Sequence, residues 1–304
     1  MTQHHPGTAE PAETTAVVPD DAATEAAEAA ATPAPRWTRY VAVGDSFTEG
    51  LWDPYPYDDG TPAPAGTASA ARQRGWADRL ADTLSARRVA AGLPPLEYAN
   101  LAIRGRLLRH IVDDQLPQAL AAAPDLVSLV GGGNDILRPQ ADVDALSQRL
   151  EDAVVQARAA GADVLLGTCF RAGGALRHTR SRTGQYNANV WSIARRHGAY
   201  VLDVWGMRSL YDWRMWSDDR VHLTPEGHRR VSAAALVGLG LRPDDADFDA
   251  SLGVPERVPL AARTRAEVQW ARTHAVPWVQ RRLKGTSSGD ERVAKWPTPT
   301  TWPR

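Results

Sequence analysis

Between residues 37 and 240, short apolar runs alternate with longer segments in which apolar residues recur every three or four positions. Short apolar runs that end in glycine or polar residues are typical of strands buried in a sheet. Apolar residues at intervals of three and four predict amphipathic helices. The predicted strands span residues 37–43, 96–101, 126–130, 163–168 and 199–203, and the predicted helices span 74–91, 107–122, 143–160, 180–197 and 224–239.

Five strand–helix repeats in succession predict the α/β fold class. In each βαβ unit the helix crosses over the sheet and returns the chain to a parallel strand. The expected architecture is therefore a three-layer α/β/α sandwich, with a parallel sheet between two layers of helices. Residues 37–240 are expected to form this domain.

The two ends of the chain lack the alternation. Residues 1–36 are rich in Ala, Thr, Glu and Pro and have no apolar face, so we expect a disordered N-terminal extension. Residues 241–284 hold one more amphipathic segment, over 261–282, and are expected to form a C-terminal helical extension. Residues 285–304 are rich in Gly, Ser, Thr and Pro and are expected to be a disordered tail.

Composition excludes several functional classes. The 304 residues carry 35 basic and 36 acidic side chains without a basic cluster, so a nucleic-acid partner is not expected. Cys169 is the only cysteine, which excludes an intrachain disulfide and a zinc–thiolate cluster. No apolar run is long enough for a membrane span. Since residues 1–36 do not resemble a secretory signal, and the chain has one thiol, we expect a cytoplasmic protein.

A long proline-rich segment follows the first predicted strand and its turn. Residues 51–68 contain four prolines and the aromatic residues Trp52, Tyr55 and Tyr57, so regular structure is not expected there. Loops of this length are usually functional or disordered. In one hypothesis the loop forms a wall of a pocket in which Trp52 and Tyr55 bind substrate. The alternative is a solvated connection.

Residues with suitable chemistry for acyl transfer follow four of the strands, and the carboxyl ends of parallel strands meet at one edge of the sheet. Ser46 can attack as the nucleophile, and His222 can take its proton. Asp219 lies three residues before His222 and can orient the imidazole from within one loop. The backbone N–H groups of Ser46 and Gly105 and the side-chain amide of Asn134 can donate to an oxyanion.

The order of these segments is similar to that of four sequence blocks of the SGNH (GDSL-type) hydrolases. The blocks here are Gly44-Asp45-Ser46, Gly105, Gly132-Gly133-Asn134-Asp135 and Asp219-Arg220-Val221-His222. The resemblance covers residues 37–240 and implies a flavodoxin-like five-stranded parallel sheet with strand order 2-1-3-4-5. It also implies Ser46 as nucleophile, His222 as base and Asp219 as orienting acid, with an oxyanion hole formed by Ser46, Gly105 and Asn134. Phe47 stands where the family motif has leucine.

Each of these residues also has a plain structural explanation. An isolated Gly-Asp-Ser or Asn-Asp is often only a turn, and a lone histidine is more often structural than catalytic. The joint occurrence at successive strand ends is what favours catalysis. Asp218 and Asp203 remain alternative orienting acids. The remaining polar residues near the motifs, which are expected to organise loops or pack structurally, are Asp45, Asp135 and His228.

Two further matches are set aside. Residues 285–289 read Gly-Thr-Ser-Ser-Gly and match a nucleophile elbow, but no strand precedes them and no histidine follows. Cys169 is expected to be a buried, small apolar residue rather than a nucleophile.

The sequence therefore predicts a serine hydrolase that cleaves carboxylic esters of small molecules through an acyl-serine intermediate. No cluster in the blocks has metal-ligand spacing, so no metal or other cofactor is expected. An acyltransferase or thioesterase with the same catalytic groups is an alternative, as is a non-catalytic binding module on the same fold. The acyl chain, the leaving group and the oligomeric state do not follow from the sequence.

Overall fold

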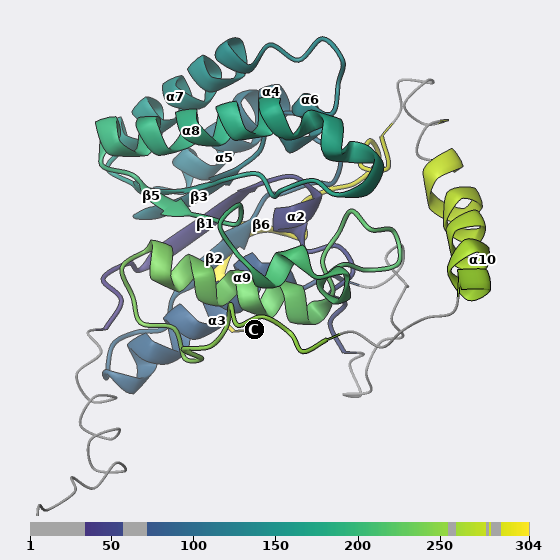
Figure 1. Ribbon diagram of the computed structural model, residues 1–304. Coiled ribbons are helices and arrows are strands. Elements are labelled where there is room, and N and C mark those ends of the chain that lie inside the picture. Colours follow the sequence, from purple (N-terminus) through teal and green to yellow (C-terminus); the bar gives the residue numbers. More distant parts are fainter. Residues whose placement is uncertain (1–33, 57–71, 255–259, 278–279, 281–286, 304) are drawn as a thin grey trace, which may run out of the picture. The chain divides into compact units, whose positions relative to one another are not determined.

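A computed structural model describes residues 34–56, 72–254, 260–277, 280 and 287–303 (Figure 1). A six-stranded sheet has the order β5-β4-β3-β1-β2-β6. Its strands are β1 (Arg39–Gly44), β2 (Glu97–Asn100), β3 (Leu126–Val130), β4 (Asp163–Gly167), β5 (Tyr200–Leu202) and β6 (Trp296–Thr301). Neighbours among β1 to β5 are parallel, which confirms the predicted five-stranded parallel sheet and its order 2-1-3-4-5. Of the expected N-terminal extension, 1–36, residues 1–33 lie outside the described residues.

The centre of the sheet is buried on both faces. Val41 of β1 pairs with Val127 of β3, and every residue of β3 is buried. A parallel strand covered on both faces needs apolar side chains at successive positions, which explains the continuous apolar run over Leu126–Val130.

Helices cover both faces, so the molecule has the three layers that the sequence predicts (Figure 1). The helices of one face are α3 (Gly75–Ala90) and α9 (Pro225–Gly238), and those of the other are α4 (Leu108–His110), η1 (Ile111–Gln115), α5 (Leu116–Ala121), α7 (Val143–Ala159) and α8 (Arg180–His197). Each face has its own apolar cluster. One contains Trp76 of α3 and Val231 of α9, and the other contains Leu150 of α7 and Val190 of α8.

Strand β6 differs from the expected disordered tail. It pairs antiparallel with β2 at the edge of the sheet, with Glu97 opposite Thr301 and Asn100 opposite Trp296. Trp296 and Trp302 are buried, at 4% and 3% exposure. The sequence Trp-Pro-Thr-Pro-Thr-Thr hides the strand because it lacks an apolar alternation and contains two prolines. Proline is compatible with a strand at the edge, where one row of N–H groups has no partner strand.

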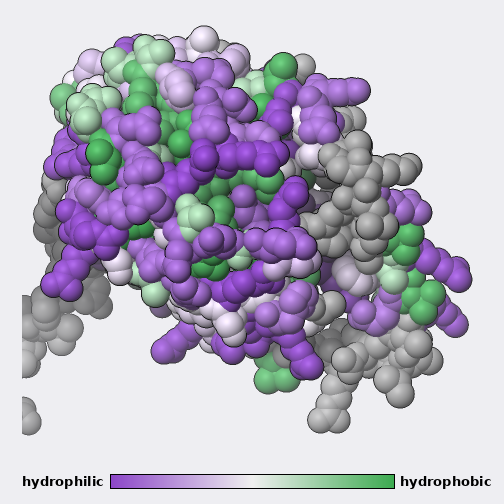
Figure 2. Space-filling view, turned by 90° about the horizontal axis from the view of Figure 1, so that it is seen from above, coloured by the Kyte–Doolittle hydropathy of each residue, from purple (hydrophilic) through white to green (hydrophobic). Residues whose placement is uncertain are grey.

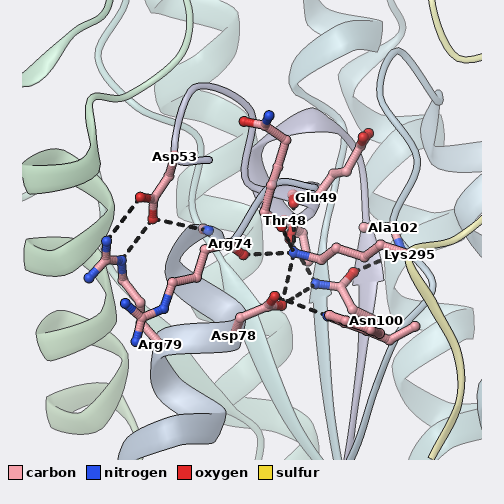
Figure 3. A network of polar contacts seen from close by, with 12 residues as sticks. Thr48, Glu49, Asp53, Arg74, Asp78, Arg79, Asn100, Ala102 and Lys295 are labelled. Carbon is pink, nitrogen blue, oxygen red and sulfur yellow. Dashed lines mark hydrogen bonds and ion pairs between the residues drawn. The ribbon is translucent and has the colours of Figure 1, made fainter. Parts of the chain in front are cut away.

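A buried ion pair fixes the chain just before β6 (Figure 3). Lys295 Nζ lies 2.9 Å from Asp78 Oδ1 of α3 and donates to the carbonyl oxygen of Glu49 at 2.7 Å. It also donates to two further carbonyls, those of Gln73 and Arg74. Because buried charges are stable only when paired and hydrogen-bonded, Lys295 ties the C-terminal segment to α3 and to the end of α2 (Ser46–Glu49).

The expected C-terminal helix is described in part. Helix α10 (Leu260–Trp270) begins one residue before the predicted span 261–282, and the π-helical turn η5 (Ala271–Ala275) lies within it. Residues 278–279 and 281–282 lie outside the described residues. Trp270 Nε1 donates to the carbonyl oxygen of Asp219 at 3.2 Å, and Glu267 pairs with Arg220 at 2.7 Å. The extension therefore contacts the loop that carries His222.

Short helices follow several strands: α6 (Gly133–Ile136), η2 (Gly174–Thr179), η3 (Ser209–Tyr211) and η4 (Trp213–Met215). Within the described ranges, no helix has the length and apolar character needed to cross a bilayer. Figure 2 shows a face on which hydrophilic side chains predominate and hydrophobic ones form small groups. Small groups of this kind are normal on protein surfaces.

Candidate active site

Ser46 lies where β1 ends and α2 begins. The last residue of β1 is Gly44, and a side chain there would lie 2.5 Å from Thr48 Oγ1 and 2.8 Å from the carbonyl oxygen of Val130. Only glycine lets the strand and α2 approach this closely. Asp45 caps α2 by accepting a hydrogen bond from Phe47 N at 3.1 Å. Ser46 is thus the first residue of a helical turn, where backbone N–H groups have no helical partner.

The structure brings Ser46, His222 and Asp219 into one hydrogen-bonded series. Ser46 Oγ lies 2.8 Å from His222 Nε2, and His222 Nδ1 lies 2.6 Å from Asp219 Oδ2. Asp219 Oδ1 accepts from the backbone N–H groups of Val221 and His222 at 2.9 and 3.0 Å. This is the arrangement that a base needs in order to take a proton from a serine hydroxyl.

The environment keeps the Asp219 carboxyl ionised. Burial raises its pKa, but the hydrogen bond and charge of His222, together with the two backbone donors, lower it to about 2. The two alternative acids have other positions. Asp203 lies 3.1 Å from Thr168 Oγ1, and Asp218 is exposed. Of the three candidates, Asp219 is the one that contacts His222.

A fourth side chain contacts this series. Trp52 Nε1 donates to Asp219 Oδ2 at 2.8 Å, the same oxygen that faces His222. Trp52 has a left-handed backbone conformation, with φ of 71°. The sequence did not indicate this contact, because the two residues are far apart in the chain and the direction of a loop side chain depends on its backbone conformation.

Asn134 lies at the start of α6, after a glycine turn that follows β3. Gly132 has φ of 95°, and a side chain there would lie 2.7 Å from the ring of Tyr186. Asn134 Nδ2 donates to Asp45 Oδ2 and to the carbonyl oxygen of Arg106, both at 3.1 Å. Burial raises the pKa of the Asp45 carboxyl to about 6, although the Phe47 N–H and the charge of His222 act against this rise. Asp45 therefore organises the loop around Asn134.

Gly105 lies in the turn after β2. Its φ of 76° is in the left-handed region, and a side chain there would lie 2.0 Å from Ser287 Oγ. The turn is joined to the Ser46 segment by two hydrogen bonds, from Ile103 N to the Gly44 carbonyl at 3.2 Å and from Arg104 N to Glu49 Oε2 at 2.6 Å. The Gly105 N–H has no acceptor among the described residues, and Gly105 is not among the residues that line the cavity described next.

A cavity of about 470 Å³ opens over Ser46, His222 and Asn134. Its walls are mostly apolar and aromatic, which suits the binding of carbon chains or rings. Apolar and aromatic residues that line it are Phe47, Val130, Ile136, Leu137, Phe170, Leu176, Leu210, Tyr211, Trp213, Trp216, Val221 and Leu223, and its arginines are Arg171, Arg180 and Arg220.

The two aromatic residues expected to bind substrate do not line this cavity. Trp52 points to Asp219 instead, as described above. The hydroxyl of Tyr55 donates to buried Asp78 at 2.8 Å, and its ring packs against the core cluster that includes Trp296. An aromatic ring with a hydroxyl can be anchored in a core when a buried acceptor is available, which the sequence pattern does not show. Tyr57 and most of the remaining loop lie outside the described residues.

His228 and Asp135 have the structural roles expected of them, whereas Cys169 is only partly buried and lines the cavity. Burial of its thiol raises the pKa, so the reactive thiolate is disfavoured. His228 is buried and lies 3.1 Å, through Nε2, from the carbonyl oxygen of Leu51. Asp135 accepts a hydrogen bond from Leu108 N at 2.9 Å. Among the described residues, no three His, Cys, Asp or Glu side chains are grouped as a metal site.

Comparison with known proteins identifies the family of this chain. The sequence model of the GDSL-like lipase/acylhydrolase family matches residues 42–230, which is more than half of the chain and includes all of the blocks above. The chain belongs to the GDSL-like lipase/acylhydrolase family. It is therefore a carboxylic-ester hydrolase of the GDSL/SGNH type, with the α/β fold of that family. No curated protein matches the chain.

Solved structures similar to this GDSL hydrolase include esterases. Axe2, an acetylxylan esterase from Geobacillus stearothermophilus, is 23% identical, with a TM-score of 0.53 over 67% of this chain and 95% of Axe2. LAE5, an α/β hydrolase enzyme from the metagenome of Lake Arreo, Spain, is 21% identical, with a TM-score of 0.52 over 67% of this chain and 95% of LAE5. At these identities the likeness establishes the shared fold.

Proposed function

We propose that this hydrolase cleaves carboxylic esters through an acyl-serine intermediate, with Ser46 as nucleophile, His222 as base and Asp219 as orienting acid. The observation that carries the proposal is the pair of short contacts of His222, 2.8 Å to Ser46 Oγ and 2.6 Å to Asp219 Oδ2. A base within hydrogen-bond reach of the nucleophile, itself held by a carboxylate, is the geometric requirement for this chemistry.

In the first half-reaction, Ser46 Oγ attacks the carbonyl carbon while His222 Nε2 takes the hydroxyl proton. The imidazolium that forms is stabilised by the Asp219 carboxylate. The tetrahedral intermediate then expels the alcohol, whose oxygen receives the proton from His222, and the acyl group stays on Ser46. In the second half, water attacks the acyl carbon and gives a proton to His222. Ser46 Oγ leaves with that proton, and the carboxylic acid is released.

The oxyanion donors proposed for both intermediates are the N–H groups of Ser46 and Gly105 and the amide of Asn134. The first two have no acceptor among the described residues. Asn134 must exchange one of its 3.1 Å hydrogen bonds, to Asp45 or to the Arg106 carbonyl, for a bond to the oxyanion. Catalytic hydrogen bonds of this kind often form only in the substrate complex.

The test is turnover of 4-nitrophenyl acetate by the wild type and by Ser46→Ala and His222→Ala. Each variant is expected to lose activity while its circular dichroism spectrum stays unchanged. Because triad members act as a unit, the double variant is expected to be little slower than either single one. Losses that multiply in the double variant, or turnover that does not need Ser46, would contradict the proposal and favour a binding module.

The substrate is proposed to be a small ester that fits the 470 Å³ cavity. Acetylated carbohydrates are one candidate class, since Axe2 acts on acetylxylan. Transfer of the acyl group to an alcohol, or cleavage of a thioester, would use the same groups, and product analysis with added alcohol or thioester substrates separates these cases. A cytoplasmic location remains a proposal that the single cysteine supports, and fractionation of cells that produce the protein would test it.

A further inference from the structure

The cavity that contains Ser46 and His222 also carries three guanidinium groups, from Arg171, Arg180 and Arg220. Arg171 follows β4, and Arg180 is the first residue of α8. Arg220 is neutralised by its ion pair with Glu267. Arg171 and Arg180 have no such ion pair among the described residues.

Both of these side chains are held in place by contacts that do not neutralise them. The guanidinium of Arg171 lies 5.1 Å from the ring centre of Tyr211. Arg180 Nε donates to the carbonyl oxygen of Ala172 at 2.6 Å. In the part of the chain that the structure describes, neither has a carboxylate partner. Their remaining N–H groups can therefore bind an acceptor that comes from outside the protein.

The cavity offers little negative charge of its own. Among the described residues that line it, Asp45 is the sole acidic side chain, and it already accepts hydrogen bonds from Phe47 N and Asn134 Nδ2. Arg180 is partly buried beside apolar walls, where a charge acts more strongly than an exposed one, whereas Arg171 is exposed. A neutral ester would leave the Arg180 guanidinium without a counter-charge in this space and would make no use of the Arg171 guanidinium.

We propose that the preferred substrate of this site is an ester that carries an anionic group, a carboxylate, which Arg171 and Arg180 bind while Ser46 attacks the ester carbonyl. This inference rests on the proposed function. The planar guanidinium matches a carboxylate with two parallel N–H···O bonds, so the pair would fix both charge and orientation. The aromatic walls contributed by Phe170 and Trp213 would enclose the uncharged part of the molecule.

The test uses two pairs of esters that differ in one charge. Mono-4-nitrophenyl succinate and 4-nitrophenyl pentanoate place the charge, or its absence, on the acyl side, whereas 4-acetoxybenzoate and its methyl ester place it on the alcohol side. The pair that places the carboxylate on the side bound by Arg171 and Arg180 is expected to depend on these two arginines. For that pair, the ratio of kcat/KM, anionic over neutral, should be about 10- to 100-fold lower in the double variant R171Q/R180Q than in the wild type, the scale of a hydrogen bond to a charged group.

Comparing ratios between proteins cancels the intrinsic reactivity of the esters. Arg177→Gln is the matched control, because Arg177 lies in the same segment, is exposed and does not line the cavity; its ratios should equal those of the wild type. Equal ratios in R171Q/R180Q and the wild type for both pairs would overturn the inference. If the wild type and Ser46→Ala turned over all four esters equally, or not at all, the proposed function would be overturned instead.

A second, independent observation concerns Glu49, the last residue of the helical turn that begins at Ser46. Its carboxylate accepts a hydrogen bond from Arg104 N at 2.6 Å and from Arg104 Nε at 2.9 Å, and it pairs with the Arg104 guanidinium. Both side chains are buried, with exposures of 11% and 7%. Lys295 Nζ donates to the Glu49 carbonyl oxygen at 2.7 Å. Arg104 directly precedes Gly105.

We infer that Glu49 is a positioning residue that sets the Gly105 N–H relative to Ser46. The nucleophile and Glu49 share one helical turn, and Glu49 binds the backbone of the neighbouring turn directly. If the Gly105 N–H is an oxyanion donor, as the proposed function holds, its place depends on this contact. A displacement of about 1 Å in such a donor can cost about 100-fold in rate.

Glu49→Ala is expected to lower kcat by about 10- to 100-fold with a much smaller change in KM. The inhibition constant of an arylboronic acid is expected to rise by a similar factor, because the boronate binds less tightly. The boronate mimics the tetrahedral intermediate, so its inhibition constant reports on the position of the oxyanion donors. A purely structural role of Glu49 would leave this constant unchanged. Glu49→Gln provides a milder variant, since its amide oxygen can still accept from Arg104 N. It is expected to fall between the wild type and Glu49→Ala.

The matched control is Asp125→Asn. Asp125 also holds the backbone of a neighbouring segment, with hydrogen bonds from Thr38 N at 2.7 Å and Arg39 N at 2.8 Å, but at the amino ends of the strands. It should lower the melting temperature and leave kcat and the boronate constant unchanged. Glu49 variants that lose only thermal stability, with wild-type kcat and boronate binding, would overturn the inference. Wild-type boronate binding in a folded Glu49→Gln would do so even if Glu49→Ala did not fold.

Discussion

One oxygen of Asp219 accepts hydrogen bonds from two aromatic rings, His222 at 2.6 Å and Trp52 at 2.8 Å. In the proposed mechanism, the indole donor helps to fix the carboxylate that stabilises the imidazolium of His222. The ring of Trp52 also makes an edge-to-face contact with His274 of η5, with 6.2 Å between the ring centres. Trp52 therefore contacts the Ser46–His222–Asp219 series through Asp219 and does not line the cavity.

Replacing Trp52 by Phe keeps an aromatic ring and removes the donor. We expect kcat to fall by about 10-fold. A hydrogen bond to a charged group is worth roughly 1.5–3 kcal/mol, and part of this energy stabilises the ground state and the transition state equally, so that part does not affect kcat. The ratio of kcat/KM for short and bulky esters should not change. Tyr55→Phe, which removes a hydroxyl that binds Asp78, is the control and should leave kcat unaltered. A changed ester preference in Trp52→Phe would instead favour the original hypothesis that Trp52 binds substrate.

Replacing Asn134 by Ala removes one proposed oxyanion donor and also one partner of Asp45 Oδ2. We expect kcat for 4-nitrophenyl acetate to fall by roughly 100- to 1,000-fold, the scale for one lost donor, with a small change in KM. Single-turnover kinetics would locate the loss in acylation or deacylation. Full kcat in this variant would mean that the oxyanion is bound by other groups.

Ser46 could be chosen from the sequence as the candidate nucleophile because it follows an apolar run, and parallel strands bring such positions to one edge. His222 lies well beyond the end of β5, so its choice as the base depended on the order of the sequence blocks. The role of a glycine at the end of a strand could be inferred as well, because a side chain cannot fit where two backbone segments approach closely, as at Gly44. The contact of Trp52 with Asp219 could not. It depends on a left-handed residue in a loop and on a partner 167 positions later in the chain.

At the scale of elements, α9 is fastened to the Ser46 segment by a buried histidine. Thr224 caps the helix by accepting from Gly227 N at 3.2 Å, and His228 in the first turns reaches the Leu51 carbonyl. His228 is 1% exposed, and burial lowers its pKa to about 4. The neutral form of this histidine is therefore part of the packing between α9 and the loop after α2.

This pKa makes stability depend on pH. Between about pH 6.5 and pH 4 the unfolded chain takes up a proton at His228 while the folded protein does not, so the free energy of unfolding falls as the pH falls. Above pH 6.5 the contribution is fully present. Urea unfolding at pH 7 and pH 4.5 should show that the wild type loses about 2 kcal/mol more than His228→Gln. Asp45, whose pKa is raised, acts in the opposite direction in both proteins, so it cancels in the comparison. Equal losses would contradict the assignment.

The five parallel strands were predictable at this scale, whereas β6 was not. Buried strands need continuous apolar runs, and these are visible in the sequence. An edge strand needs only backbone pairing and a few anchors. Its anchors, Trp296 and Trp302, pack against Tyr55 and Tyr98, which precede them by 241 and 204 positions. No local pattern contains that information.

For the molecule as a whole, Lys295 joins the C-terminal segment to α2 and α3 (Figure 3). Lys295→Met should lower the free energy of unfolding by about 3–5 kcal/mol, because it leaves the Asp78 carboxylate buried without its cation. Urea unfolding measures the loss. Glu291→Gln, which changes a nearby exposed charge, is the control and should have little effect. Equal stability of Lys295→Met and the wild type would show that the donors around Asp78 suffice without Lys295.

Every other described element precedes β6 in the chain, so each leaves the ribosome before it does. While the protein is being made, β1 to β5 can already pair, but the outer edge of β2 has no neighbour and Asp78 has no cation. An open edge strand can pair with strands of other chains. We therefore expect newly made copies to be prone to aggregation between the synthesis of β2 and that of β6, until β6 pairs with β2 and Lys295 pairs with Asp78.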